Sequence, residues 1–150
     1  MSYLERLREL GYTLEPVELD AGKIMLGVRS GNLIFTSGQV SRLGDLEIKG
    51  QLGADLSVEE GYKAAQLSTV GCLNVVQTLA GGIDKVVRVV KVLGMVNVAP
   101  GFSNTPAVIH GCSDMLLHVF GESGRHARSA VGMTLPLNYA VEIEMIVEVF

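Results

Sequence analysis

One arginine near the end of the chain, Arg128, stands where every nearby residue is small. Its small neighbours in the segment HARSAVG are Ala127, Ser129, Ala130 and Gly132, and the later segment VEIEMIVEV carries three glutamates, beginning with Glu142. A planar guanidinium can hold a carboxylate through two parallel hydrogen bonds. Two roles suit this arginine: a cross-strand ion pair with a carboxylate of its own chain, or the binding of a carboxylate that belongs to a ligand.

The other reactive residue types form no metal-binding pattern. Cys72 and Cys112 each lie within an apolar helical pattern, which is typical of buried, reduced thiols. The three histidines do not have the spacing of a ligand set: His110, His118 and His126. We therefore expect no metal and no disulfide. His126 stands between two arginines, where it is either a general base or a structural residue at the rim of a site.

Composition and charge narrow the class of protein. The chain has 150 residues, of which 48% are hydrophobic and 19% charged, so it can build a core. Its net charge of −4 is the opposite of the basic face that nucleic-acid binders present. No apolar run approaches the roughly 20 residues of a membrane helix, and the N-terminus lacks the apolar stretch of a secretory signal. We expect a cytoplasmic protein that binds neither membrane nor nucleic acid.

The first third of the chain predicts a short helix and a β-hairpin. The helix covers Tyr3–Leu10. The strands cover Lys23–Val28 and Leu33–Ser37, and the Ser-Gly-Asn sequence between them favours a tight turn. The segment Ser41–Asp55 predicts a loop with one short strand, Leu46–Ile48.

Two longer helices carry clear boundary signals. Ser57 and Glu60 have the spacing of a capping box, and the helix that they begin ends at Gly81 and the glycine after it. The second helix is predicted to begin with Thr105 as its N-cap, followed by proline, and to end at Gly121.

Three strands are predicted around these helices. Asp84–Val98 is rich in valine, which favours a strand, and its charged residues break strict alternation, which predicts a bulge or burial on both faces. The last strand alternates clearly, with Glu142 on its polar face. We expect Ala127–Met133 to pair antiparallel with this last strand across a short turn, so that Arg128 faces Glu142.

This order of elements predicts an α+β fold, with one sheet covered on one face by two helices. We expect one domain, 1–150, in which residues 1–22 form the N-terminal helix and a linker. The open face of the sheet is expected to carry Arg128, Ala130, Gly132 and Glu142 and few large apolar side chains. Packing against identical subunits would cover that face.

Three segments in order resemble the Rid family (YjgF-like, reactive-intermediate deaminases): GNLIFTSGQV (Gly31–Val40), ARSAV (Ala127–Val131) and VEIEMIVEV (Val141–Val149). With the intervening helices, the match covers roughly residues 24–150. The resemblance implies a chorismate-mutase-like sheet and a homotrimer with pockets between its subunits. It also implies the hydrolysis of 2-aminoacrylate-type enamines and imines to 2-keto acids and ammonia, with no cofactor.

The resemblance also implies roles for individual residues. Arg128 would hold the substrate carboxylate, Glu142 would position or activate water, and Ser37 and Gly38 would form the pocket wall. Ala130 lies in the substrate pocket at the position where the family has a cysteine, so a thiol role is absent. The Gly-Pro-Tyr of the family's N-terminal part is also missing. These departures leave the substrate open and mark a divergent branch.

Two other functions are consistent with the sequence. The first is a non-catalytic trimer that binds or senses a small carboxylate through Arg128, which the missing tyrosine and cysteine favour. The second is RNA cleavage, which has been attached to some relatives, although an acidic chain without a basic and aromatic surface is poorly suited to bind RNA.

Overall fold

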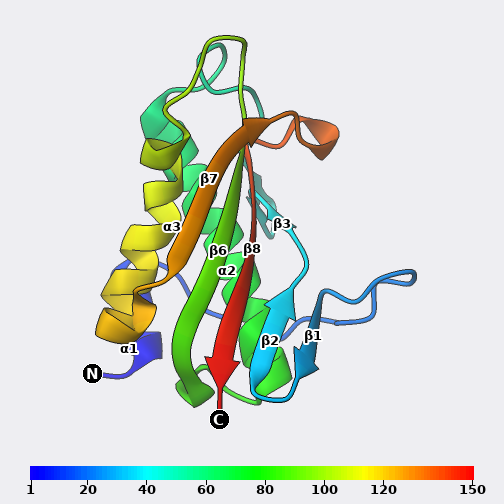
Figure 1. Cartoon of the computed structure of the whole chain (residues 1–150), viewed down its shortest axis with the longest axis vertical. Helices are drawn as coiled ribbons and strands as arrows, with labels where there is room; N and C mark the ends of the chain where they lie inside the picture. Colours follow the sequence, from blue (N-terminus) through cyan, green and yellow to red (C-terminus); the bar gives the residue numbers. More distant parts are fainter.

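The computed structural model describes residues 1–150, which form a mixed sheet with helices on one face (Figure 1). Three α-helices are present: α1 (Tyr3–Glu9), α2 (Val58–Ala80) and α3 (Thr105–Phe120). The strands are β1 (Gly27–Ser30), β2 (Leu33–Thr36), β3 (Gln39–Val40), β4 (Arg42–Leu43), β5 (Leu46–Glu47), β6 (Val86–Asn97), β7 (Ala127–Met133) and β8 (Val141–Val149). The predicted α+β class is confirmed.

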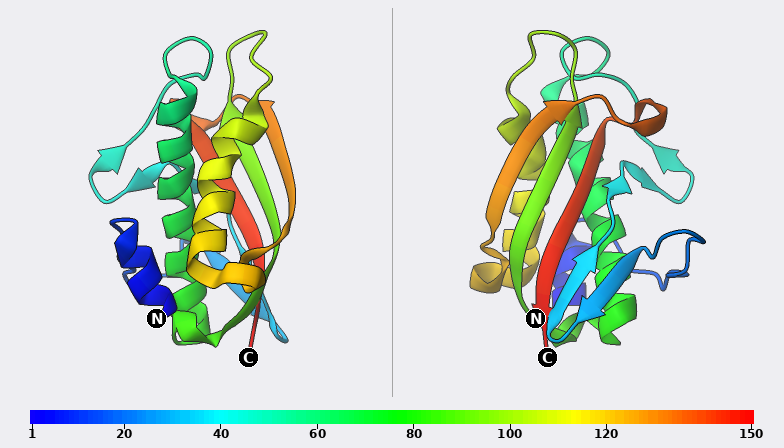
Figure 2. Two further views of the ribbon diagram at one scale, coloured as in Figure 1. Left: turned by 90° about the vertical axis from the view of Figure 1, so that its left-hand side faces the viewer. Right: turned by 45° about the vertical axis from the view of Figure 1, so that its right-hand side comes forward.

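The layers follow from the order of the strands. The main sheet runs β1-β2-β8-β6-β7, with β3 also paired to β8, while β4 and β5 form a separate ribbon. Figure 2 shows α2 and α3 side by side on one face of this sheet, as predicted, and α1 packed outside them. No helix in the structure is long and apolar enough to span a membrane.

The boundaries of α2 and α3 have identifiable causes. The Ser57 hydroxyl accepts from the backbone N–H of Glu60 at 3.2 Å, and the Glu60 carboxylate accepts from the backbone of Ser57 at 3.0 Å. The predicted capping box is therefore confirmed. In α3 the N-cap is Asn104 rather than Thr105, which is the first helical residue. The Thr105 hydroxyl instead donates to the carbonyl of Ala130 at 3.0 Å and ties α3 to β7.

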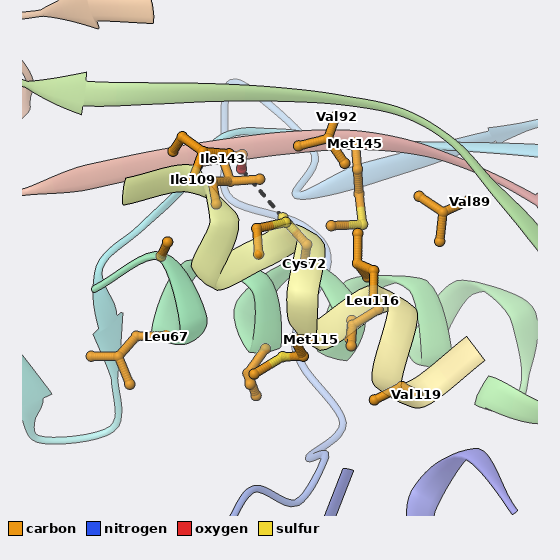
Figure 3. Packing of buried hydrophobic residues seen from close by; sticks show 14 of the residues in the cluster. Leu67, Cys72, Val89, Val92, Ile109, Met115, Leu116, Val119, Ile143 and Met145 are labelled. Atoms are coloured by element: carbon orange, nitrogen blue, oxygen red, sulfur yellow. Dashed lines mark hydrogen bonds between the residues drawn. The ribbon is translucent and has the colours of Figure 1, made fainter. Parts of the chain in front are cut away.

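The core lies between the helices and the sheet (Figure 3). Alternate residues of β8, including Ile143 and Met145, are buried beneath α2 and α3. Ile109 and Leu116 reach them from α3, and the Cys72 thiol donates to the carbonyl of Ile143 at 3.2 Å. The alternation in the sequence of this last strand correctly predicted its buried face.

The strand pairing around β7 differs from the prediction. We expected β7 and β8 to form an antiparallel hairpin, but β6 lies between them, parallel to β7 and antiparallel to β8. Strands that are joined through a helix, as β6 and β7 are through α3, usually lie parallel and adjacent. After β7 the chain passes through a short 3₁₀ segment, Pro136–Asn138, in which Leu137 and Asn138 have positive φ, and so crosses to the far side of β6.

The remaining strand predictions need smaller changes. The N-terminal hairpin is present, but its first strand is Gly27–Ser30 rather than Lys23–Val28. The predicted short strand near residue 46 is β5. The irregularity expected in β6 is confirmed as two register shifts against β8, between Val86 and Arg88 and between Val89 and Lys91.

Candidate functional site

The register of the sheet places Arg128 on the face that carries the helices. Arg128 is paired with Val92, and Val92 is paired with Met145 in β8. Laterally paired residues point to the same side of a sheet. Val92 and Met145 are buried beneath the helices. The side chain of Arg128 therefore lies on the helix side of β7, at the edge of the sheet.

Glu142 lies on the opposite, open face. It is paired with Met95 and with Val40, and it alternates with Val141 and Ile143, which are fully buried on the helix side. The predicted contact between Arg128 and Glu142 is therefore wrong.

The predicted composition of the open face also needs correction. Ala130 and Gly132 share the helix-side parity of Arg128, because they pair with Gly94 and Val96 of β6. The open face instead carries exposed apolar side chains from β2 and β7: Phe35, Val131 and Met133. The faces of Ala130 and Gly132 were predicted wrongly because the prediction paired β7 with β8, whereas β7 pairs with β6.

Only one nitrogen of the Arg128 guanidinium, Nη1, forms hydrogen bonds within the protein. It donates to Nδ1 of His110 at 2.9 Å and to Oγ of Ser113 at 3.2 Å, both on α3. No carboxylate of the chain forms an ion pair with it. The Nε and Nη2 donors make no hydrogen bond within the protein. This edge has the geometry that grips a carboxylate with two parallel bonds.

A shallow cleft of about 350 Å³ opens beside this guanidinium. It is lined by Leu117 and by six polar residues from α3, from the segment that leads into β7 and from β7 itself: His110, Ser113, Asp114, Arg125, His126 and Arg128. The one carboxylate, Asp114, accepts a hydrogen bond from the Tyr62 hydroxyl at 2.8 Å. Burial, the hydrogen bond to Asp114 and the charge of that carboxylate together raise the pKa of Tyr62 to about 12. The cleft therefore presents mainly positive charge to a ligand.

His126 and Ser113 form a hydrogen-bonded pair in this cleft. Nε2 of His126 lies 3.0 Å from Oγ of Ser113, and its Nδ1 lies 2.6 Å from the carbonyl oxygen of Gly124. Gly124 packs so closely on α3 that a Cβ there would collide with the carbonyl of Leu116, which explains the glycine.

Neither His110 nor Ser113 was predicted to belong to the site. Their spacing of three residues within a predicted helix was the available signal, because residues three apart lie on one side of a helix.

The other residues predicted for the site are Glu142, Gly38 and Ser37. A Cβ on Gly38 would collide with the Glu142 carboxylate, so the glycine leaves the space that this carboxylate occupies. Burial raises the pKa of Glu142, and the nearby Glu144 carboxylate raises it further. Ser37 precedes Gly38, and its hydroxyl donates to the carbonyl of Met25 at 2.6 Å.

Comparison with known proteins identifies the family. The family model described as "YjgF/chorismate_mutase-like, putative endoribonuclease" matches residues 6–149. The chain belongs to this YjgF family. Protein TCP17 of Trypanosoma cruzi is 40% identical over 146 residues, which cover 95% of this chain and 91% of that protein.

Two solved structures support the family assignment along the whole chain. The protein Atu1372 of Agrobacterium tumefaciens, of unknown function, has a TM-score of 0.90 and 40% identity, covering 99% of this chain and 92% of its own. A "putative endoribonuclease" from Shewanella oneidensis has a TM-score of 0.91 and 32% identity, covering 99% of this chain and all of its own. The predicted membership of the YjgF-like family is confirmed.

Ala130 is the residue at the position where the resemblance implies a cysteine. Ala130 lies on the helix side of β7, two residues beyond Arg128, and is partly buried against the core. The two thiols of the chain do not replace the missing one, because Cys72 and Cys112 are both fully buried. Burial raises the pKa of both, that of Cys112 to about 12, and so disfavours the reactive thiolate.

Proposed function

We propose that this YjgF-family protein hydrolyses imines or enamines that carry a carboxylate, giving ammonia and a 2-keto acid. The observation that carries the proposal is the free edge of the Arg128 guanidinium in an open, mainly cationic cleft. That edge suits the carboxylate shared by all such substrates. Membership of the YjgF family and the resemblance to its deaminase branch supply the reaction type.

The chemistry requires little more than a placed water and proton transfer. An enamine first shifts a proton from its nitrogen to its β-carbon and so becomes an imine. Water then adds to the electrophilic C=N carbon, and the resulting carbinolamine expels ammonia and leaves the 2-keto acid. A carboxyl group whose pKa is raised towards neutrality is suited to this transfer, which is typically worth about 10²–10⁴-fold in rate. Burial and the nearby Glu144 carboxylate shift the pKa of Glu142 in this direction. The proposed roles are therefore carboxylate binding for Arg128 and acid–base chemistry for Glu142, without a cofactor.

A homotrimer would bring the two groups of residues together. Within one chain Arg128 and Glu142 lie on opposite faces of the sheet. A head-to-tail ring allows the β7 edge of one subunit to meet the open face of the next. Phe35, Val131 and Met133 are each 38–40% exposed on that face, which favours its burial against another subunit.

Ammonia release from freshly generated 2-aminoacrylate and related imino acids tests the proposal. We expect the protein to accelerate release and Arg128→Ala to lower kcat/KM by about 10² or more, because charged hydrogen bonds contribute roughly 1.5–3 kcal/mol each. Arg42→Ala is the matched control, since Arg42 is exposed on the separate β4–β5 ribbon. The absence of acceleration across a panel of imino acids would refute the deaminase proposal.

Binding measurements beside the ammonia assay distinguish deamination from the two alternatives, carboxylate binding without catalysis and RNA cleavage. Tight binding of 2-keto acids by calorimetry, without turnover of any imine, would support a binding or sensing protein. RNA cleavage is included because the family description and the Shewanella relative carry the name endoribonuclease. The net charge of −4 opposes binding to a phosphate backbone, and we expect no RNA binding even at low salt.

A further inference from the structure

The hydrogen bonds around Ser113 have a defined direction. The carbonyl of Gly124 can only accept, so Nδ1 of His126 carries the proton of the neutral ring and donates to it at 2.6 Å. Nε2 of His126 is then the acceptor, and the Ser113 hydroxyl donates to it at 3.0 Å. Arg128 can only donate, and it does so to Oγ of Ser113 at 3.2 Å. The hydroxyl proton of Ser113 therefore points at a base whose orientation a backbone carbonyl fixes.

Ser113 differs in this respect from Thr69 and Thr78, two hydroxyl residues within α2. Ser and Thr in a helix commonly donate to the carbonyl four residues earlier. Thr69 does so to Ala65 at 2.7 Å, and Thr78 does so to Asn74 at 2.8 Å. Ser113 makes no such bond to its own helix and directs its proton to His126 on the neighbouring segment.

The same cleft contains donors for a developing negative charge. Nη1 of Arg128 also donates to Nδ1 of His110, at 2.9 Å. Because Nδ1 is the acceptor, the proton of the neutral His110 ring lies on Nε2, and this histidine offers the cleft an N–H donor. Donors placed beside a nucleophile stabilise the oxyanion that forms on the attacked group. The guanidinium of Arg128 beside Oγ and the N–H of His110 can both serve this purpose.

The charge of the cleft indicates the class of substrate. Arg125 and Arg128 both line it, and the single carboxylate, that of Asp114, is hydrogen-bonded to Tyr62. The only ion pair of Arg125 is a 3.5 Å contact with Glu122 in which both side chains are largely exposed. Such a pair contributes little, so Arg125 is available to a ligand. A small molecule that carries a carboxylate fits this cleft in charge and in size.

We propose that Ser113 and His126 form a nucleophile–base pair that hydrolyses small esters bearing a carboxylate, an activity separate from imine deamination. Oγ of Ser113 attacks the ester carbonyl while Nε2 of His126 takes its proton. The tetrahedral intermediate then expels the alcohol, which receives that proton, and leaves an acyl group on Ser113. Water, deprotonated by His126, attacks the acyl group and releases the acid and the free serine. A nucleophile, a base and an orienting group within hydrogen-bond reach are the requirements for this chemistry.

Covalent labelling with diisopropyl fluorophosphate tests the nucleophile directly. The serine attacks phosphorus and fluoride leaves, so intact-mass and peptide mass spectrometry should find one diisopropylphosphoryl group per chain, on Ser113. His126→Gln should slow labelling by about 10²–10⁴-fold, as expected for the loss of a general base. Ser129→Ala is the matched control, because Ser129 pairs with Leu93 and points to the opposite face of β7. Wild-type protein without an adduct on Ser113, or equal labelling of His126→Gln, would overturn the proposal.

Two chromogenic esters test the substrate class. We expect the kcat/KM for the mono-4-nitrophenyl ester of succinate to exceed that for 4-nitrophenyl acetate at least tenfold. Arg125→Gln should reduce this preference, and Ser113→Ala should abolish hydrolysis of both esters. Hydrolysis that persists in folded Ser113→Ala, or the absence of any ester hydrolysis by the wild type, would refute the activity. Neither result bears on ammonia release, so failure of this proposal and failure of the deaminase proposal are distinguishable.

Discussion

Arg128 and Glu142 lie on opposite faces of the same sheet, with the whole of β6 between their strands. Adjacent strands are about 4.8 Å apart, so the backbones of β7 and β8 are separated by roughly 10 Å. Because the two side chains point to opposite faces, they lie farther apart still. A small substrate bound by Arg128 therefore does not reach Glu142 of the same chain. If both residues act on one substrate, they come from two subunits.

A mixture of two inactive variants tests this arrangement. Arg128→Ala and Glu142→Gln, unfolded and refolded together, should recover about a quarter of the wild-type deaminase rate. In a random ring, each site draws its arginine from one subunit and its glutamate from the next, and a quarter of the pairs combine both intact residues. Each variant refolded alone is the control, with the oligomeric state of every sample checked by light scattering. A mixture that forms the same oligomer but recovers no activity would exclude a shared site.

Gly38 should be required for the position of Glu142. A methyl group at residue 38 would collide with the Glu142 carboxylate, while the backbone of Gly38 does not need a glycine conformation. Gly38→Ala should therefore fold and lower kcat by about tenfold or more, because small displacements of a catalytic group are costly. Gly71→Ala, on α2, where the nearest atoms to an added Cβ belong to the side chain of Gln39 and not to Glu142, is the control in the same steady-state assay. An unchanged kcat in Gly38→Ala would remove Glu142 from the proposed mechanism.

The elements that were predicted correctly are those whose signals are local. The capping box of Ser57 and Glu60 and the alternation of β8 each depend on a few neighbouring residues, and the structure contains both. The family resemblance was equally local, because it rested on three short segments. Over most of the chain, the local sequence favours the same elements that the tertiary structure buries. The helix layer and the buried face of β8 could therefore be predicted from the sequence.

Two features could not be predicted from local sequence signals: the strand that pairs with β7, and the cleft. The short connection after Met133 suggested a hairpin, and nothing local shows that Pro136–Asn138 carries the chain past β6. The strand–helix–strand order was the better signal, since such units usually place their strands parallel and adjacent. The contact of Ser113 with His126 depends on how closely the segment around Gly124 packs on α3, which only the tertiary structure shows.

Glu142 should make stability depend on pH in a defined direction. Its pKa is raised by burial and by Glu144, from an ordinary value of 4.5, so the folded state disfavours its ionised form. This penalty is fully present above the folded pKa, decreases as the pH falls through that pKa, and disappears below about 4.5. Glu142→Gln should therefore raise Tm slightly at pH 7 and leave it unchanged near pH 4.

Thermal unfolding followed by circular dichroism at the two pH values provides the measurement. Glu122→Gln is the matched control, because the Glu122 side chain is 85% exposed. A gain in Tm for Glu142→Gln that is as large at pH 4 as at pH 7 would mean that the effect comes from packing and not from ionisation.

Two helix glycines with different surroundings should differ in how much stability they lose when replaced by alanine. A Cβ on Gly111 of α3 would collide with the backbone carbonyl of Tyr62, so α2 and α3 would have to move apart. A Cβ on Gly71 of α2 would lie 3.3 Å from the side chain of Gln39, which can move. We expect Gly111→Ala to lower the free energy of unfolding by about 2 kcal/mol or more through overpacking. Gly71→Ala should stay within about 1 kcal/mol of the wild type, since the gain in helix propensity offsets the mild contact.

Urea unfolding of both variants measures the difference, with the slope of the transition used to check that the unfolded states are comparable. Gly111 lies between His110 and Ser113 in the helix, so the shift of α3 that its substitution requires would also move the groups that hold Nη1 of Arg128. Gly111→Ala should therefore weaken carboxylate binding at a temperature where the variant is still folded, whereas Gly71→Ala should not. Equal stabilities for the two variants would show that the α2–α3 contact is not what fixes the position of α3 beside Arg128.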